Sequence, residues 1–219
     1  MYKAPSIRRS FSLCLARALL FIACSSGVHA TPNLVFWDSP VTGRLSQTVV
    51  TDIFQDSTGL IWLGTQEGLN IYDGRRVEAY LPQLGEENSL LFGNILGIQE
   101  SADGTVWVVT ESGAQQFDRL NRYFDTPENF RNLDTEIHDF DLEPEGRLWL
   151  ALTGSIGLYH SESGEFTEYK IPPDLKANKN VVNSITAAEN GGAYIAIAGK
   201  GIFLIDIANG KLVYEAIAS

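Results

Sequence analysis

Residues 48–74, TVVTDIFQDSTGLIWLGTQEGLNIYDG, decide the fold of this chain. An apolar stretch leads into a polar turn that ends at Gly59, and Trp62 follows three residues later. The same pairing of a glycine with an aromatic residue occurs four times, and the aromatic residues lie 45, 42 and 45 residues apart. The four pairs are Gly59 and Trp62, Gly104 and Trp107, Gly146 and Trp149, and Gly191 and Tyr194. A strand-rich unit repeated every 40 to 50 residues or so is typical of a β-propeller.

Each unit predicts four strands joined by hairpins, which is the make-up of one propeller blade. The first strands are expected at 49–55, 95–100, 137–142 and 184–188, and the strands with the aromatic anchors at 60–65, 105–110, 147–151 and 193–198. A second turn is predicted at Gly68, Gly113, Gly157 and Gly201, because glycine adopts the positive φ that such turns require. We therefore expect an all-β chain with four four-stranded blades, at about 45–80, 90–125, 135–170 and 181–215.

The repeated aromatic residues are interpreted as core. Large aromatic side chains dominate protein cores, and blades pack face to face, so the anchors should lie between blades and not in a ligand site. Two other architectures fit less well. A helical solenoid needs long segments with helical periodicity, which the chain beyond residue 30 lacks, and a β-sandwich would not repeat one motif four times at this spacing.

Residues 1–30 have the pattern of a secretory signal peptide. All of their charges are basic, an apolar run covers Leu19 to Cys24, and small residues lead up to Ala30. This pattern predicts export to the periplasm with cleavage after Ala30. The pair Arg8 and Arg9 partly resembles a twin-arginine signal, and the residues before Cys24 partly resemble a lipoprotein cleavage site. Ordinary export is the favoured route. Attachment to a membrane would need either a lipid on Cys24 after lipoprotein cleavage or an anchor further downstream.

The charge of the remaining residues, 31–219, excludes several partners. The chain has 16 basic and 27 acidic residues, and residues 1–30 hold four of the basic ones, so the rest carries a net charge of −15. This acidity argues against nucleic acid as a partner. Both cysteines, Cys14 and Cys24, lie in the predicted signal peptide. Disulfides, catalytic thiols and thiolate metal sites are therefore not expected in residues 31–219, and no cofactor is predicted.

The first unit resembles the two-component regulator propeller repeat. It has an apolar strand, the Asp56–Gly59 turn, the Trp62–Thr65 strand, Gly68-Leu69 and Tyr72-Asp73, and Leu45-Ser46-Gln47 precedes it as in the family. The second copy keeps Gly104, Trp107, Thr110, Gly113, Phe117 and Asp118. The third has Ser155 where the second glycine is expected, and the fourth, with Tyr194 for tryptophan, diverges most. The resemblance covers roughly residues 34–215.

This resemblance implies a sensory role. Such propellers are usually the periplasmic input regions of bacterial histidine kinases or diguanylate cyclases, some of which sense oligosaccharides. The expected partners are thus a small-molecule or oligosaccharide ligand and a signalling output domain or partner chain. The family usually has about seven blades. Residues 33–37 look like a strand that closes a last blade, yet the fourth unit already has four strands. We therefore expect further repeats after Ser219, and a self-contained four-bladed propeller is the alternative.

Few residues suggest chemistry. His138 and His160 are expected to be structural or solvated, and the carboxylate pairs Glu143 with Glu145 and Asp139 with Asp141 are expected on a solvated face. Ligand recognition is most expected in the long loops, 81–93, 125–135 and 171–183. No catalytic residue is predicted. The other functional classes that stay open are a propeller hydrolase or lyase acting on polysaccharide, and a protein-interaction scaffold.

Overall fold

The computed structural model describes residues 42–175, 182–189, 191–208 and 211–218. The chain divides into two compact units, Met1–Asp38 and Ser39–Ser219, and every described residue belongs to the second. The predicted signal peptide, its cleavage point after Ala30 and the predicted strand at 33–37 lie outside the described residues. In the part that is described, no helix is long and apolar enough to cross a membrane.

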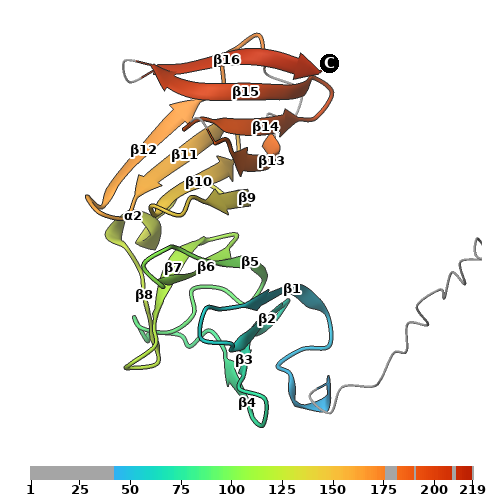
Figure 1. Ribbon diagram of the computed structural model, residues 1–219, viewed down its shortest axis with the longest axis vertical. Helices are drawn as coiled ribbons and strands as arrows, with labels where there is room; N and C mark the ends of the chain where they lie inside the picture. Colours follow the sequence, from blue (N-terminus) through green and yellow to red (C-terminus); the bar gives the residue numbers. More distant parts are fainter. Residues whose placement is uncertain (1–41, 176–181, 190, 209–210, 219) are drawn as a thin grey trace, which may run out of the picture. The chain divides into compact units, whose positions relative to one another are not determined.

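Four antiparallel four-stranded sheets follow one another along the chain (Figure 1). Blade one contains β1 (Val50–Gln55), β2 (Ile61–Thr65), β3 (Gly68–Tyr72) and β4 (Val77–Tyr80). Blade two contains β5 (Ile95–Glu100), β6 (Val106–Thr110), β7 (Gly113–Asp118) and β8 (Tyr123–Asp125). Blade three contains β9 (Ile137–Leu142), β10 (Arg147–Leu152), β11 (Ser155–His160) and β12 (Glu165–Lys170). Blade four contains β13 (Val182–Ala187), β14 (Ala193–Ile197), β15 (Gly201–Ala208) and β16 (Lys211–Ala218).

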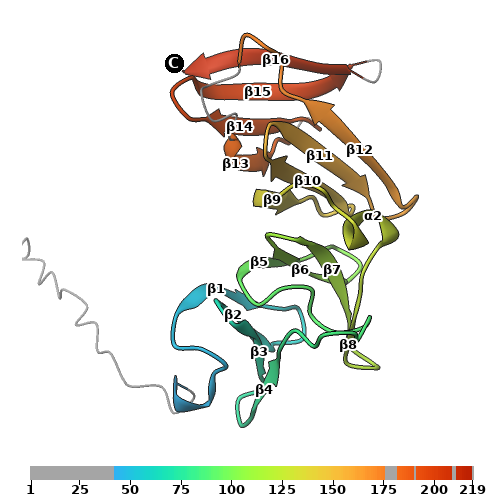
Figure 2. The same cartoon turned by 180° about the vertical axis from the view of Figure 1, so that it is seen from behind.

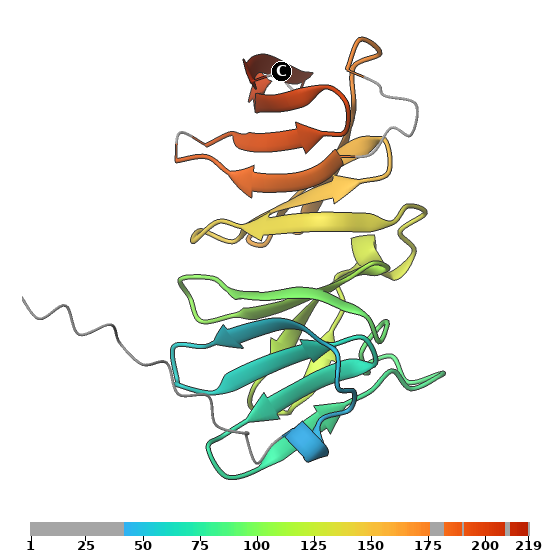
Figure 3. The same ribbon diagram turned by 90° about the vertical axis from the view of Figure 1, so that its right-hand side faces the viewer.

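The predicted all-β fold with four four-stranded blades is confirmed. Within each blade the strands are hydrogen-bonded in chain order, which Figure 3 shows most clearly. The first strands of successive blades contact one another, β1 with β5, β5 with β9 and β9 with β13 (Figures 1 and 2). Two short helices complete the described elements, η1 (Thr42–Arg44) before blade one and α2 (Glu128–Arg131) between blades two and three.

Neighbouring blades bury apolar clusters between their faces. The three tryptophan anchors are 0% exposed, and each belongs to one of three clusters that join successive blades. Trp62 packs edge-on against Phe117 of blade two, with ring centroids 5.1 Å apart, and Trp107 packs against Tyr159 of blade three at 5.6 Å. Loss of one such side chain to alanine costs about 3–5 kcal/mol, so the tryptophans hold the blades together.

Tyr194 is not buried as an anchor among the described residues. Its side chain is 40% exposed. Alternate residues of a strand point to opposite faces, and Ala193 and Ile195 of β14 pack into the cluster shared with blade three. Tyr194 therefore points to the other face of blade four, against which no described blade packs. Ile53, on the corresponding free face of blade one, is 66% exposed for the same reason.

Gly157 is not part of a turn, and that prediction is also wrong. In blades one and two, Gly68 and Gly113 open the third strand, and Gly201 does so in blade four. Ser155, which pairs with Leu152, takes this place in blade three, and the turn before it contains Gly154 with φ +81°. Gly157 lies within β11, where a Cβ would meet the Phe166 ring at 2.7 Å. Close packing therefore explains this glycine, and turn geometry does not.

Side chains of one blade cap the backbone of the next. The free edge of each first strand presents unpaired N–H groups. Oδ2 of Asp52 accepts a hydrogen bond from the N–H of Ile98 over 2.7 Å, and Oδ2 of Asp139 accepts one from the N–H of Ile185 over 2.9 Å. Because Asp139 and Asp141 serve this structural role, the prediction that they lie on a solvated face is wrong.

The long loops are fastened to the blades by buried groups. Gln115, which is 0% exposed, accepts a hydrogen bond from the N–H of Leu91 over 2.7 Å and so holds the end of loop 81–93. Asn70 holds the segment before blade one in the same way, by accepting from the N–H of Ser46 over 2.8 Å. In loop 125–135, Phe130 of α2 inserts its side chain into the cluster between blades two and three.

Candidate functional site

The first hairpin turn is built in the same way in every blade. In blade one, the N–H of Gly59 donates to the carbonyl oxygen of Asp56 over 2.9 Å. The same bond recurs from Gly104 to Ser101, from Gly146 to Glu143 and from Gly191 to Ala188. The four glycines have φ values between +86° and +94°, in the region that favours glycine. The residue three positions before the glycine thus has a fixed place beside the anchor strand.

In blade one this place holds a buried carboxylate, Asp56, which is 4% exposed. Its Oδ2 accepts the indole N–H of Trp62 over 2.8 Å, and its Oδ1 accepts from the backbone of Thr58 and Leu60. Burial raises the pKa of Asp56, but the hydrogen bonds from Thr58, Trp62 and Leu60 and the charge of Arg119 outweigh it, so the pKa is below its usual value. Asp56 is therefore an ionised structural acceptor.

Arg119 ties blade one to blade two at this turn. Its Nη2 lies 3.1 Å from Oδ2 of Asp56 and 2.8 Å from Oε1 of Glu100. Glu100 also accepts hydrogen bonds from the N–H and the hydroxyl of Ser57, both over 2.7 Å. Burial raises the pKa of Glu100, but Ser57 and Arg119 together hold it below its usual value. One guanidinium thus has two carboxylate partners, one from each blade.

A second guanidinium occupies the corresponding place between blades three and four, but it comes from a different strand. Glu143, 8% exposed, accepts the indole N–H of Trp149 over 2.7 Å and lies 2.8 Å from Nε and 2.5 Å from Nη2 of Arg147. A Cβ on Gly191 would lie 3.5 Å from the Arg147 guanidinium, just as one on Gly104 would lie 3.8 Å from that of Arg119. The expectation that Glu143 is solvated is wrong.

The two guanidiniums differ in their partners. Glu100 lies four residues before its turn glycine, and the residue at that position in blade four is Ala187. Arg147 therefore pairs with Glu143 of its own blade and lacks a counterpart of Glu100, the carboxylate that blade two supplies to Arg119. Among the described residues, Nη1 of Arg147 makes no hydrogen bond. Because alanine replaces glutamate at position 187, the Nη1 group of Arg147 has no acceptor in the described part of the chain and the space beside it is open.

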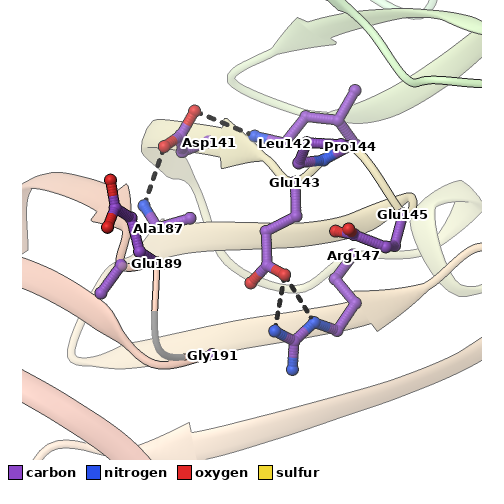
Figure 4. A pocket seen from close by; sticks show the side chains of 10 residues that line it. Asp141, Leu142, Glu143, Pro144, Glu145, Arg147, Ala187, Glu189 and Gly191 are labelled. Carbon is purple, nitrogen blue, oxygen red and sulfur yellow. Dashed lines mark hydrogen bonds and ion pairs between the residues drawn. The ribbon is translucent and has the colours of Figure 1, made fainter.

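A cleft of about 660 Å³ lies at this place (Figure 4). Its walls are residues 141–145 and Arg147 of blade three, and residues 187–189 and Gly191 of blade four. Four carboxylates, Asp141, Glu143, Glu145 and Glu189, and one guanidinium line this cleft. Asp141 is fully engaged, since it accepts from Gln99 over 3.0 Å and from the Ala187 N–H over 2.8 Å. The side chains of Glu145 and Glu189 make no hydrogen bond or ion pair with other described residues.

The turn of blade two has no carboxylate at the position of Asp56. Ser101 stands at the position of Asp56, and its hydroxyl donates to Asp103 over 2.6 Å. The indole nitrogen of Trp107 is consequently buried without a hydrogen-bond partner. Here a backbone bond joins the turns of neighbouring blades, from the N–H of Ala102 to the carbonyl oxygen of Pro144 over 2.9 Å.

Two of the three loops favoured for ligand recognition, 81–93 and 125–135, line two other clefts, and residues 176–181 of the third, 171–183, lie outside the described residues. One cleft, of about 420 Å³, lies along residues 82–91 beside Arg131, and the other, of about 730 Å³, lies along residues 129–136 beside β12. Arg131 is already paired with Glu128 at 3.5 Å, and the larger cleft is lined by acidic residues without a basic one. Neither cleft therefore resembles the one at Arg147, where an arginine lacks a carboxylate partner that the equivalent arginine of another interface has.

The histidines form no catalytic arrangement in the described residues. Nε2 of His138 lies 2.8 Å from the Thr153 hydroxyl, and His160 ends β11 opposite Glu165. Within the same residues, no group of three or more His, Cys, Asp or Glu is placed to hold a metal ion. The cleft beside Arg147 was not expected from the sequence. The signal that could have revealed it is the difference between Glu100 and Ala187 at one repeat position.

Comparison with known proteins confirms the resemblance to the propeller family. The model of the two-component regulator propeller matches residues 44–67. A segment of 49 residues is 47% identical to histidine kinase P4 of Formosa agariphila; it makes up 22% of this chain and 4% of the kinase. The family match therefore lies in the first repeat.

Solved structures share the fold. The extracellular domain ascribed to the hybrid two component system BT3049 of B. thetaiotaomicron matches with a TM-score of 0.61 at 22% identity, over 78% of this chain and 25% of that domain. Virginiamycin B lyase from Staphylococcus aureus matches with a TM-score of 0.57 at 18% identity, over 76% of this chain and 55% of the lyase. At these identities the likeness concerns the fold alone. The matches thus span 4% of the kinase and a quarter of the extracellular domain.

Proposed function

We propose that this chain is a non-catalytic sensory propeller that binds a ligand outside the cytoplasm for a bacterial two-component or cyclic-di-GMP signalling receptor. The repeat matched at residues 44–67 and the local identity to a histidine kinase support this role. The extracellular origin of the similar sensor propeller and the signal-like residues 1–30 support a periplasmic location. Signal output would then require an output domain or a partner chain.

The cleft between blades three and four is the proposed ligand site. The observation that carries this assignment is the incomplete partner set of Arg147, which holds Glu143 but meets Ala187 where Arg119 meets Glu100. A ligand bound there would contact both blades at once. It would bind one arrangement of the two blades better than another and so shift their equilibrium, which is how binding can be signalled.

The experiment is a binding screen with the full chain. Thermal-shift and calorimetric titrations would compare neutral oligosaccharides, carboxylic acids, amines, amino acids and dipeptides, while mass spectrometry follows each compound for turnover. Ala187→Glu supplies the missing carboxylate and fills the cleft, so it should abolish binding without lowering the melting temperature. Glu87→Gln, an exposed carboxylate of loop 81–93, is the matched control and should leave binding unchanged.

Two results would contradict the proposal. Binding that Ala187→Glu leaves intact would move the ligand site away from the cleft between blades three and four. Conversion of a bound compound into product would replace the sensory role with an enzymatic one.

A further inference from the structure

Arg119 and Arg147 form similar ion pairs at two different blade interfaces, and the two pairs differ in the number of carboxylates. Nη2 of Arg119 contacts carboxylate oxygens from two blades, at 3.1 and 2.8 Å. Arg147 contacts one carboxylate, that of Glu143, through Nε and Nη2. Arg119 lies against Gly104, the turn glycine of its own blade, and Arg147 lies against Gly191, the turn glycine of the following blade. The second carboxylate is therefore a group for which the blade interface has a defined place, and in blade four Ala187 leaves that place open to the cleft.

The electrostatics of the cleft restrict what can enter that place. Its lining carries four carboxylates and one guanidinium, so a simple anion approaching Arg147 would also meet the negative charges of Glu145 and Glu189. A simple cation would satisfy these two carboxylates, but it would leave the free edge of Arg147 without an acceptor. A ligand that carries a carboxylate and an ammonium group meets both requirements, because each of its charges then faces an opposite one.

We propose that the cleft binds a small zwitterion, such as an amino acid or a short peptide, whose carboxylate pairs with Arg147 in the place that Glu100 fills at Arg119. The ammonium group lies toward Glu145 and Glu189. The Ala187 side chain is short enough to admit the carboxylate. This inference rests on the proposed sensory function, and it names the chemical class of the ligand for the same site.

The closing experiment uses the full chain and three matched dipeptides. Calorimetry would compare alanylalanine with N-acetyl-alanylalanine, which lacks the ammonium group, and with alanylalanine amide, which lacks the carboxylate; the twenty amino acids are screened beside them. We expect zwitterions to bind and either capped dipeptide to bind about tenfold more weakly or worse, since each lost charge pair is worth a factor of this order.

Variants of the two ends of the cleft test the orientation. Arg147→Gln should reverse the preference, so that the amide binds better than the free dipeptide, whereas Arg147→Lys should keep the preference for the free dipeptide. Glu189→Gln should weaken binding of the amide and the free dipeptide, but it should not weaken the N-acetyl form, because that ligand is an anion and loses a repulsive neighbour. A misfolded variant would lose all ligands together, and the near-ultraviolet circular dichroism spectrum of each variant identifies that case.

The possible outcomes separate this inference from the proposed function. Equal binding of the free and capped dipeptides, or absence of binding by any zwitterion, overturns the zwitterion proposal. If a neutral oligosaccharide then binds and Ala187→Glu blocks it, the sensory function stands and only the ligand class is wrong. If no compound of any class binds, both proposals fail.

Discussion

Trp149 donates its indole N–H to the buried carboxylate of Glu143 over 2.7 Å, and the same bond joins Trp62 to Asp56 over 2.8 Å. The third tryptophan, Trp107, has no such acceptor, because Ser101 occupies the corresponding position. Three equally buried side chains thus differ in one hydrogen bond. The three tryptophans therefore allow the contribution of ring burial to stability to be separated from that of the indole hydrogen bond.

Replacement of each tryptophan by phenylalanine should show this separation. Trp62→Phe and Trp149→Phe remove the indole donor from a buried carboxylate, so each should lose about 1–3 kcal/mol more free energy of unfolding than Trp107→Phe. The loss of ring volume is common to all three variants and cancels in the comparison. Denaturant unfolding measures the three values, and an equal loss in all three would show that the indole bonds contribute nothing.

An acceptor introduced at Ser101 should stabilise blade two. The side chain of Ser101→Asn can reach the unpaired indole nitrogen of Trp107 as that of Asp56 reaches Trp62, and a gain of about 1 kcal/mol in unfolding free energy is expected. Ser101→Ala is the control, since it removes the hydroxyl that donates to Asp103 without offering an acceptor. Ser101→Asn less stable than Ser101→Ala would refute this view of the turn.

Acid should weaken the contact between blades one and two. The pKa values of Asp56 and Glu100 are held below their usual values of 3.8 and 4.5 by hydrogen bonds that outweigh burial. Depressed carboxyl pKa values stabilise the fold above the unfolded-state pKa, and this stabilisation is lost as the pH falls through the folded-state values. Unfolding measured between pH 7 and pH 3 should therefore show a loss below about pH 4.5.

The variant Arg119→Gln tests the origin of that pH dependence. Arg119 contributes to the depressed pKa of both carboxyls, so its removal should make the unfolding free energy less dependent on pH between 5 and 3. Arg131→Gln, which alters an exposed pair with Glu128, serves as the control. An unchanged pH profile in Arg119→Gln would mean that the acid sensitivity arises elsewhere.

Gly97 should tolerate no side chain. A Cβ there would lie 2.7 Å from the Phe140 ring of blade three, which is buried against it. Gly97→Ala is expected to destabilise the chain by about 1–3 kcal/mol through overpacking. The double variant Gly97→Ala, Phe140→Leu should recover part of this loss. No loss in the single variant would show that the two blades can separate slightly at this point.

The period of the sequence predicted the blades well because each one repeats the same turn geometry. The positive φ of Gly59, Gly104, Gly146 and Gly191 follows from the turn itself. The prediction failed at Gly157 because a glycine can be required either by a turn or by close packing. Gly157 looks like a turn glycine, but it makes room for the ring of Phe166. The exposure of Tyr194 could not be predicted from its own blade, because it depends on what packs against the outer face.

The candidate site was harder to predict because it arises from a difference between repeats. The two guanidiniums of Arg119 and Arg147 reach equivalent places from non-equivalent positions in the sequence. No single-repeat motif contains both, and Glu143 beside Glu145 looked like one of many solvated acidic pairs. The sequence holds the difference between Glu100 and Ala187, and the contacts of the two arginines show that Ala187 leaves Arg147 without a second carboxylate.

A double-mutant cycle on Arg147 and Ala187 tests this central claim most directly. Unfolding free energies would be measured for the original chain, Ala187→Glu, Arg147→Gln and the double variant. If the place opposite Arg147 is that of Glu100, Ala187→Glu should stabilise the chain only when Arg147 is present, with a coupling of roughly 1 kcal/mol after allowance for solvent screening of the partly exposed arginine. A coupling of zero, or destabilisation by Ala187→Glu in the presence of Arg147, would contradict the account.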